Sequence, residues 1–169
     1  MPKVLADGRI KLVALTTAPA NPAAPTVAEL NDGIDISCKV MHSDYSLGPT
    51  DSDTMDEKEL CAVGNGVVLG SSNYAGSITI FRYLDEAGKP DAIEDVAWDL
   101  FKEKGAVIWL YEREGQKHTE AFAAGDVVDG FEFTTDWPKP PSSRTGYIKR
   151  GITLAPTGRM AYQAVVAAA

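Results

Sequence analysis

Histidine and cysteine, on which much enzyme and metal chemistry depends, are scarce in this sequence. The 169 residues include two of each, His42 and His118 and Cys38 and Cys61, and neither pair has the spacing of a CxxC or HExxH motif. The GxSxG and GxxxxGKS fingerprints of hydrolases and nucleotide-binding proteins are also absent. We therefore expect no catalytic residue, no metal site and no cofactor, and predict that the protein is not an enzyme. The two cysteines are expected to be buried, reduced thiols.

Positive charge and long apolar runs are lacking as well. The chain has 16 Lys and Arg against 24 Asp and Glu, a net charge of −8, which argues against binding nucleic acid by neutralising its phosphates. No run approaches the roughly 18 apolar residues of a membrane-spanning helix. The first residues, MPKVLADGRIKLVAL, place charges among short apolar pieces, unlike a signal peptide. We expect a protein that is folded in the cytoplasm and has no membrane partner.

Short strand patterns, in contrast, recur along the chain. Residues 34–41 alternate apolar and polar side chains, which is the pattern of a half-buried strand. Further segments rich in β-branched and aromatic residues predict strands at 9–15, 59–70, 76–84, 106–114, 127–136, 146–155 and 159–166. Within the strand at 106–114, Trp109 and Tyr111 are expected to lie in the core.

One segment has a helical period. Apolar residues recur at i, i+3, i+4, i+7 and i+8 from Ile93 to Phe101, which is the spacing of one buried face. Asp91 is placed to cap the first turn and Gly105 to end the last one, so we predict a helix over 92–104.

The order of these elements predicts the fold class. TVAEL at 26–30 adds one expected helical turn, and no helix alternates regularly with the strands. We therefore predict a mainly β protein, an antiparallel β-sandwich or barrel with one flanking α-helix, in a single domain over residues 1–169.

The stretch HSDYSLGPTDSDTMDEKE, residues 42–59, is longer and more acidic than a hairpin connection requires. Its carboxylates raise the possibility of calcium binding, but an EF-hand loop that started at Asp51 would have Met55 at its fifth position and no glycine at its sixth. We favour a solvated or partner-facing loop over a metal site. The acids considered as ligands are Asp51, Asp53, Asp56, Glu57 and Glu59.

Two tryptophans are candidate interface anchors. Trp98 lies off the apolar face of the predicted helix, where it could instead cover a neighbouring strand. Trp137 ends a strand just before a proline-rich loop, where it could instead cap the barrel mouth. An open β-sandwich also leaves unpaired strand edges, which must be blunted or paired with other copies.

The order of these features resembles that of the major tail tube proteins of long-tailed, siphovirus-type bacteriophages, particularly those that infect actinobacteria. None of the features is an active-site motif, so the resemblance is one of order and pattern over nearly the whole chain. The segments that carry it are APTVAELNDGIDIS, the acidic stretch before ELCAVGNG, NYAGSITIFRY, DAIEDVAWDLFKEKG, WLYEREG, AGDVVDGFEFTTD and LAPTGRMAYQAVVA.

The resemblance implies a structural virion protein that self-assembles into hexameric rings. The rings would stack into the tail tube, and the inner sheets of six subunits would form one barrel around a negatively charged lumen through which DNA is ejected without specific binding. The implied partners are other copies of the chain and tail proteins such as the tape measure, tail terminator and distal tail proteins. The implied location is the virion tail, after assembly in the bacterial host cytoplasm.

The resemblance also assigns roles to particular segments. Residues 42–54 would form a long loop that reaches neighbouring subunits and the adjacent ring, while an N-terminal arm at 1–8 and a C-terminal tail at 163–169 would touch the next ring. The candidate contact residues in the loop are His42, Ser43, Asp44, Tyr45, Asp51 and Asp53.

Two other functions remain open at this point. A small β-barrel ligand-binding module would need an apolar cavity, which Trp109, Tyr111 and Phe131 could line. An enzyme that uses paired carboxylates, as in glycoside hydrolysis, would need an Asp or Glu pair that the sequence does not identify.

Overall fold

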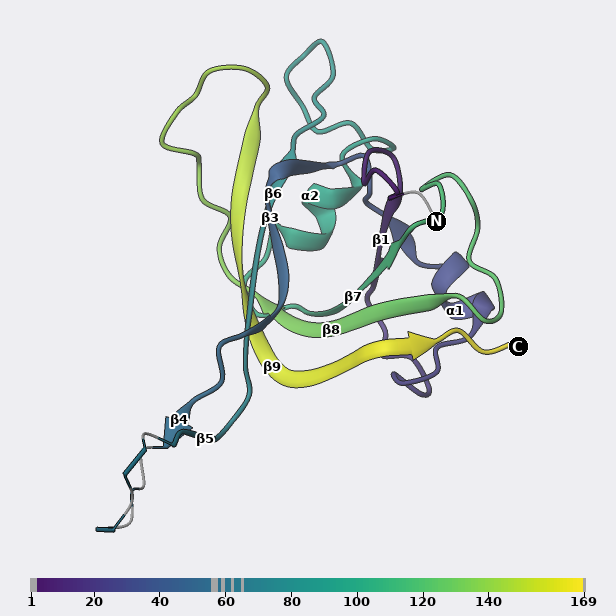
Figure 1. Cartoon of the computed structure of the whole chain (residues 1–169). Coiled ribbons are helices and arrows are strands. Elements are labelled where there is room, and N and C mark those ends of the chain that lie inside the picture. The colour runs from purple at the N-terminus through teal and green to yellow at the C-terminus, as the bar shows by residue number, and fades with distance from the viewer. Residues whose placement is uncertain (1–2, 56–57, 59, 62, 65, 169) are drawn as a thin grey trace.

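The computed structural model describes residues 3–55, 58, 60–61, 63–64 and 66–168. Within them a seven-stranded sheet has the order β2-β1-β7-β8-β9-β6-β3, with every neighbouring pair antiparallel, and β4 and β5 form a separate pair (Figure 1). The elements are β1 (Ile10–Leu15), α1 (Val27–Asn31), β2 (Ile34–Asp35), β3 (Val40–Thr50), β4 (Thr54–Met55), β5 (Val68–Leu69), β6 (Asn73–Phe81), α2 (Val96–Phe101), β7 (Val107–Glu114), β8 (Val127–Thr135) and β9 (Lys149–Val165).

The sheet curls into a half-barrel through the long strand β9. Its first part, Lys149–Leu154, pairs with β6, and its remainder pairs with β8. Register shifts along the β8–β9 pair mark β-bulges, which increase the local bend of a strand. The two strands expected at 146–155 and 159–166 are therefore one, since β9 runs through both, and Ala155 and Pro156 pair with Thr134 and Phe133 of β8.

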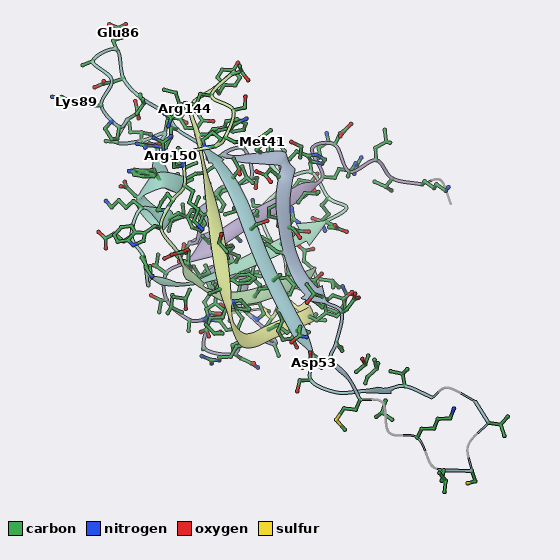
Figure 2. The ribbon with its side chains drawn as sticks, turned by 90° about the vertical axis from the view of Figure 1, so that its left-hand side faces the viewer. Met41, Asp53, Glu86, Lys89, Arg144 and Arg150 are labelled. Carbon is green, nitrogen blue, oxygen red and sulfur yellow. The ribbon has the colours of Figure 1, made fainter. Side chains whose placement is uncertain are left out.

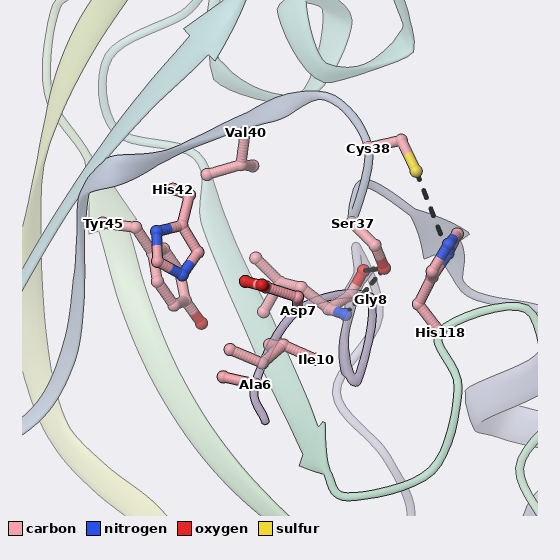
Figure 3. Close-up of a pocket in the computed structure, with 11 residues that line it drawn as sticks. Ala6, Asp7, Gly8, Ile10, Ser37, Cys38, Val40, His42, Tyr45 and His118 are labelled. Carbon is pink, nitrogen blue, oxygen red and sulfur yellow. Dashed lines mark hydrogen bonds between the residues drawn. The ribbon is translucent and has the colours of Figure 1, made fainter. Parts of the chain in front are cut away.

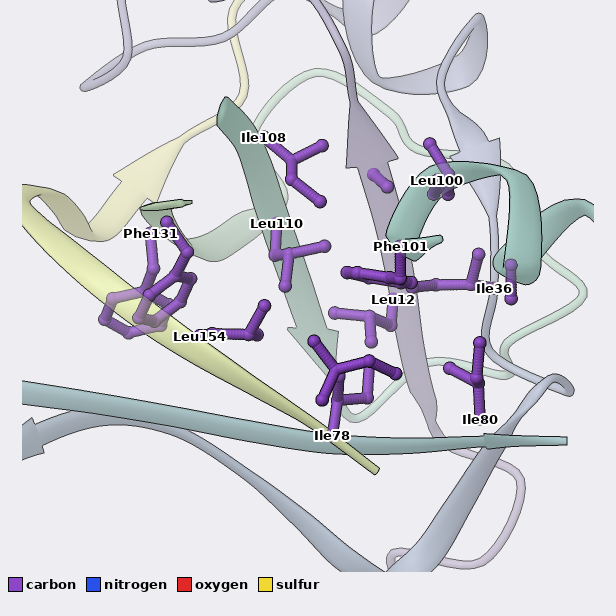
Figure 4. Close-up of a cluster of buried hydrophobic side chains, with 14 residues drawn as sticks. Leu12, Ile36, Ile78, Ile80, Leu100, Phe101, Ile108, Leu110, Phe131 and Leu154 are labelled. Carbon is purple, nitrogen blue, oxygen red and sulfur yellow. The ribbon is translucent and has the colours of Figure 1, made fainter. Parts of the chain in front are cut away.

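Apolar side chains fill both faces of the central strands. Figure 4 shows the inner core, where α2 packs against strands of the curled sheet. An outer core on the opposite face lies under α1 and the C-terminal residues, and contains Leu30, Phe122 and Val166. Residues of β1, β7 and β8 alternate between the two cores, so that consecutive residues of each strand are buried.

The helix expected over 92–104 is shorter, Val96–Phe101. Asp91 does cap a turn, since its carboxylate accepts the amides of Ile93 and Glu94 at 2.8 Å, but that turn is separate from α2. The helix begins after Asp95, whose buried carboxylate receives hydrogen bonds from Arg82 at 3.0 and 3.2 Å. As a result Ile93 is exposed, while Ala97, Leu100 and Phe101 are buried as predicted.

The strand expected at 34–41 is interrupted. β2 ends at Asp35, residues 37–39 form a turn, and β3 begins at Val40. The turn is held by Ser37, whose hydroxyl accepts the amide of Leu12 at 2.9 Å. It places Cys38 at the surface, and Cys61 is exposed as well, so the expectation of two buried thiols is wrong.

The acidic stretch is not a loop over its whole length. Residues 42–50 belong to β3, which pairs with β6 from Tyr45 to Thr50. In the expected strand at 59–70, only Val68–Leu69 of the described residues is a strand, and Leu60 and Cys61 lie in a turn. Asp56, Glu57 and Glu59, considered as calcium ligands, lie outside the described residues.

The two chain termini have different surroundings in the described subunit, and their contacts with another ring stay a prediction. Residues 163–168 of the expected C-terminal tail stay against the body, because β9 continues to Val165, Val166 is buried, and the amide of Ala167 donates to the Pro25 carbonyl at 2.9 Å. Residues 3–8 of the expected N-terminal arm are exposed.

The remaining elements follow the sequence closely. β1, β6, β7 and β8 lie where strands were predicted, and Trp109 and Tyr111 are buried. Helix α1 matches the expected turn, with a capping box between Thr26 and Glu29. No helix among the described residues is long and apolar enough to cross a membrane.

Candidate assembly surfaces

The described residues of the segment 51–72, here called the arm, leave the half-barrel between β3 and β6. Figures 1 and 2 show the arm extending away from the body. It is held by the β4–β5 pair and by two hydrogen bonds, from the Asp53 amide to the Ser71 carbonyl (2.9 Å) and from the Gly70 amide to the Asp53 carbonyl (2.6 Å). Its described large apolar side chains are all more than half exposed: Met55, Leu60, Val63, Val67, Val68 and Leu69.

Such a group of exposed apolar side chains is unusual in a monomer. Contiguous apolar patches on soluble proteins mark sites of interaction with other molecules. A two-stranded hairpin is also marginally stable at best in water without a surface to pack on. The arm therefore has the chemistry of a segment that is completed by another molecule.

The base of the arm is polar and braced by Asn73. The Asn73 side-chain amide donates to the Asp51 carbonyl at 3.1 Å and to the Asp53 carboxylate at 2.8 Å. Both aspartates are exposed, and neither forms an ion pair with another described residue.

The outward side of β3, β6 and β9 carries small hydroxyl side chains. Ser46, Ser77 and Thr153 lie opposite one another across the three strands, and the hydroxyl of Thr79 donates to the carboxylate of Asp44. We call these five residues the hydroxyl face. The alternate residues, such as Ile78 and Leu154, point into the inner core. The sequences of β3 and β6 contain no Lys or Arg and one acid, Asp44.

The outer edge of β3 is open. Within the described chain β3 pairs only with β6, so backbone groups along its other edge have no strand partner. A long open edge is a ready template for pairing with another chain.

A hollow of about 350 Å³ lies between the start of β1, the turn at 37–39 and β3 (Figure 3). His42 and Tyr45 line it from β3, and the Cys38 sulfur lies 3.8 Å from Nδ1 of His118 at its rim. The Tyr45 hydroxyl donates to the carboxylate of Glu112 on β7. Burial, together with the nearby Glu112 carboxylate, raises the pKa of Tyr45 well above its ordinary value.

The structure distributes the predicted contact residues along β3 and the base of the arm. His42 and Tyr45 border the hollow, Ser43 is exposed, and Asp44 belongs to the hydroxyl face. Asp51 and Asp53 stand together where the arm begins. The six residues thus do not form one loop, and their role in contacts between subunits stays a prediction.

The two tryptophans have different surroundings. The ring of Trp98 packs on the inner core and lies beneath the guanidinium of Arg82, 3.8 Å from the ring centroid. It is thus engaged within the subunit, with the inner core and with Arg82, the residue that follows β6. Trp137 is 59% exposed at the end of β8, so its ring is available to a neighbour.

Residues 138–150, for which no role was predicted, form a second surface feature. With Trp137 they make up the basic loop, residues 137–150, which contains four cations and no acid. Tyr147 and Ile148 in this loop are strongly exposed. The positive charge of the basic loop can be seen in the sequence. Its position relative to the arm cannot, because that position depends on how β6 pairs with β9.

Comparison with known families gives one clear result. The sequence profile of the phage tail tube protein family matches residues 1–169. A comparison with curated proteins found no significant match.

Proposed function

The chain belongs to the phage tail tube protein family, and on this premise we propose that it forms hexameric rings that stack into the conduit for DNA delivery. Members of this family are structural components of the virion and not enzymes. The observation in this chain that best supports ring and tube formation is the arm, whose apolar side chains have no cover within the described subunit.

Assembly would complete each incomplete surface of the subunit. In the proposed ring, the open edge of β3 pairs with a neighbour, so that the curled sheets of successive subunits join around the lumen. The arm and the exposed residues 3–8 contact the adjacent ring. Further tail proteins, such as the tape measure, tail terminator and distal tail proteins, are proposed partners at the lumen and at the two ends of the tube.

The hydroxyl face is the proposed lumen wall. Ser46, Ser77, Thr153 and Asp44 of this face are exposed in the subunit, whereas Thr79 is buried. The strands β3 and β6 offer no cation to DNA phosphates, and their single carboxylate per subunit, Asp44, would repel phosphates within a Debye length of about 8 Å. DNA would therefore slide past these two strands without being held.

Removal of the arm tests the proposal. The variant replaces residues 51–72 by Asn-Gly, the sequence of a tight hairpin turn, which directly joins β3 to β6 at the Thr50–Asn73 pair. Wild-type protein should form tubes in negative-stain electron microscopy, whereas the variant should remain a folded single subunit with an unchanged circular dichroism spectrum. Tubes formed by the variant, or loss of its fold, would show that the arm is not an assembly element.

A matched pair of substitutions controls for surface changes in general. Val68→Ser with Leu69→Ser removes apolar area from the arm, and Val107→Ser with Val127→Ser removes it from exposed positions on the body. We expect the first pair to suppress tube formation and the second pair to leave it unchanged.

The structure does not favour the ligand-binding alternative. Trp109 and Tyr111 belong to the outer core and Phe131 to the inner core, so the three rings lie on opposite faces of the sheet. They cannot line one cavity, which was the requirement of that hypothesis.

A further inference from the structure

We propose that the base of the arm in one subunit docks onto the basic loop of a second copy of this chain in the next ring. The inference rests on the proposed function and identifies the two surfaces that meet when rings stack. It follows from their charges, from their positions in the subunit, and from the shape of the basic loop.

The two segments carry opposite charge. Residues 51–59 contain five acids and one lysine, −5 + 1 = −4, and residues 137–150 contain four cations and no acid, +4, of which Lys139 is paired with Asp136 at 3.5 Å, just outside the segment. Such complementary patches steer association and fix its orientation. The cations are Lys139, Arg144, Lys149 and Arg150.

The two segments lie at opposite ends of the same strands. Thr50 pairs with Asn73 at one end of β6, next to the arm, and Phe81 pairs with Lys149 at the other end, next to the basic loop. The nine residues of β6 separate the ends by about 27 Å, at roughly 3.4 Å per residue. Figure 2 shows Asp53 at one end and Arg144 and Arg150 at the other. The arm base therefore does not neutralise its own subunit's basic loop.

The basic loop forms a hollow that is lined by cations and apolar side chains. A hollow of about 200 Å³ is lined by Pro141, Arg144, Tyr147, Ile148, Lys149 and Arg150. Its three cations form no ion pair with described residues: Arg150 donates to a backbone carbonyl and Lys149 contacts the sulfur of Met41. A carboxylate entering this hollow would find cations together with apolar contact from Tyr147 and Ile148.

The arm supplies the matching groups. Asp51 and Asp53 are exposed, and Met55, Val68 and Leu69 stand beside them with more than half of their surface in water. The two surfaces therefore match in charge and in apolar character. DNA phosphate could also bind the four cations, but it would leave the exposed side chains of Tyr147 and Ile148 unmatched.

This contact has a defined symmetry. It joins two different patches of identical chains, which is a heterologous interface, and patches at opposite ends of the subunit make the contact repeat along an axis without closing. The result is a stack of rings with one polarity, as a tube that conducts DNA in one direction requires.

Charge reversal with rescue tests the inference. One variant carries Asp51→Lys and Asp53→Lys, a second carries Arg144→Glu and Lys149→Glu, and a third combines all four changes. The control, Lys102→Glu with Lys117→Glu, makes the same change in charge as the second variant on exposed lysines outside both surfaces. The measurements are the critical concentration for tube formation, by pelleting and negative-stain microscopy in 0.15 M NaCl, and circular dichroism to confirm the fold.

We expect each double reversal to raise the critical concentration by about tenfold or more, since like charges in contact cost more than the roughly 1.4 kcal/mol that corresponds to a factor of ten. The combined variant should return to within about threefold of wild type, and the control should match wild type. Rescue by the combination is the readout that a general loss of stability would not produce.

Other outcomes distinguish a failure of the inferred contact from a failure of the proposed function. If wild type forms tubes and both reversals also do so normally, the inferred contact is wrong while the proposed function stands. If both reversals fail and the combination does not recover, the two surfaces do not meet each other. Loss of binding to a short DNA duplex by the Arg144 and Lys149 variant, with normal tubes, would make the loop a nucleic-acid contact and overturn the inference. Wild-type protein that never assembles would refute the proposed function itself.

Discussion

Glu112 of β7 and Tyr45 of β3 form a contact across the open side of the curled sheet. Burial raises the pKa of Glu112 above its ordinary value of 4.5, the nearby Glu114 and Asp129 carboxylates add to this, and the hydrogen bond from Tyr45 lowers it in part. A raised pKa means that the folded state holds this proton more tightly than the unfolded state. The stability of the subunit should therefore fall as pH rises through the interval between the two pKa values.

The substitution Glu112→Gln should stabilise the folded subunit at pH 7. Glutamine has nearly the same size, keeps an oxygen that can accept the Tyr45 hydrogen bond, and carries no charge to bury. We expect this substitution to raise the free energy of unfolding at pH 7, because no charge then has to be buried beside Glu114 and Asp129. The gain should disappear below about pH 4.5, where Glu112 is protonated in both states.

Urea unfolding of monomeric protein at pH 7 and pH 4 measures this effect. The control is Glu86→Gln, an exposed residue in the loop after β6, which should change stability little at either pH. A Glu112→Gln variant no more stable than wild type at pH 7 would refute the assigned burial cost.

At the scale of secondary structure, two aspartates near α2 have unequal roles. Asp91 caps an exposed turn, whereas Asp95 is 2% exposed and accepts both Arg82 and the amide of Tyr83 at 2.9 Å. Removing one partner of a buried ion pair leaves the other charge uncompensated. We expect Asp95→Ala to lower the free energy of unfolding by about 3 kcal/mol, and Asp91→Ala by about 1 kcal/mol.

Urea denaturation followed by circular dichroism compares the two variants directly. The comparison is informative because the sequence alone, in which Asp91 is the expected helix cap, predicts the larger loss of stability for Asp91→Ala. If Asp91→Ala were equally or more destabilising than Asp95→Ala, the assigned role of the Arg82 pair would be wrong.

Some of the secondary-structure elements can be predicted from the sequence alone, and others cannot. Local patterns are enough for β1, β6, β7, β8 and α1, because their burial follows the period of the strand or the capping of the helix. The sequence predicts a loop for residues 42–50 of β3 because the polar side chains from His42 to Asp44 indicate solvent exposure. A strand face that is exposed to water has the same polar side chains. The continuity of β9 depends on pairing with β8 beyond the reach of local sequence.

The candidate surfaces could be predicted only in part from the sequence. The acidic stretch pointed to partner contacts, and it contains Asp51 and Asp53 at the base of the arm. The sequence could not show that the projecting segment begins after Thr50, nor that the basic loop lies at the other end of β6, since both facts follow from the register of the sheet.

At the scale of the whole molecule, the subunit is incomplete in two ways. The arm exposes apolar side chains, and β3 has an open edge. Each of these features would cost solubility or specificity in a protein that acts alone. Family membership gives them one explanation, assembly with identical copies into the tail tube.

Cryo-electron microscopy of the purified, assembled protein tests this account most directly. We predict a hollow tube of stacked six-membered rings, with the hydroxyl face toward the lumen and each arm against the basic loop of a subunit in the next ring. A particle that stays a single subunit at high concentration, or a tube in which the arms contact nothing, would contradict the account.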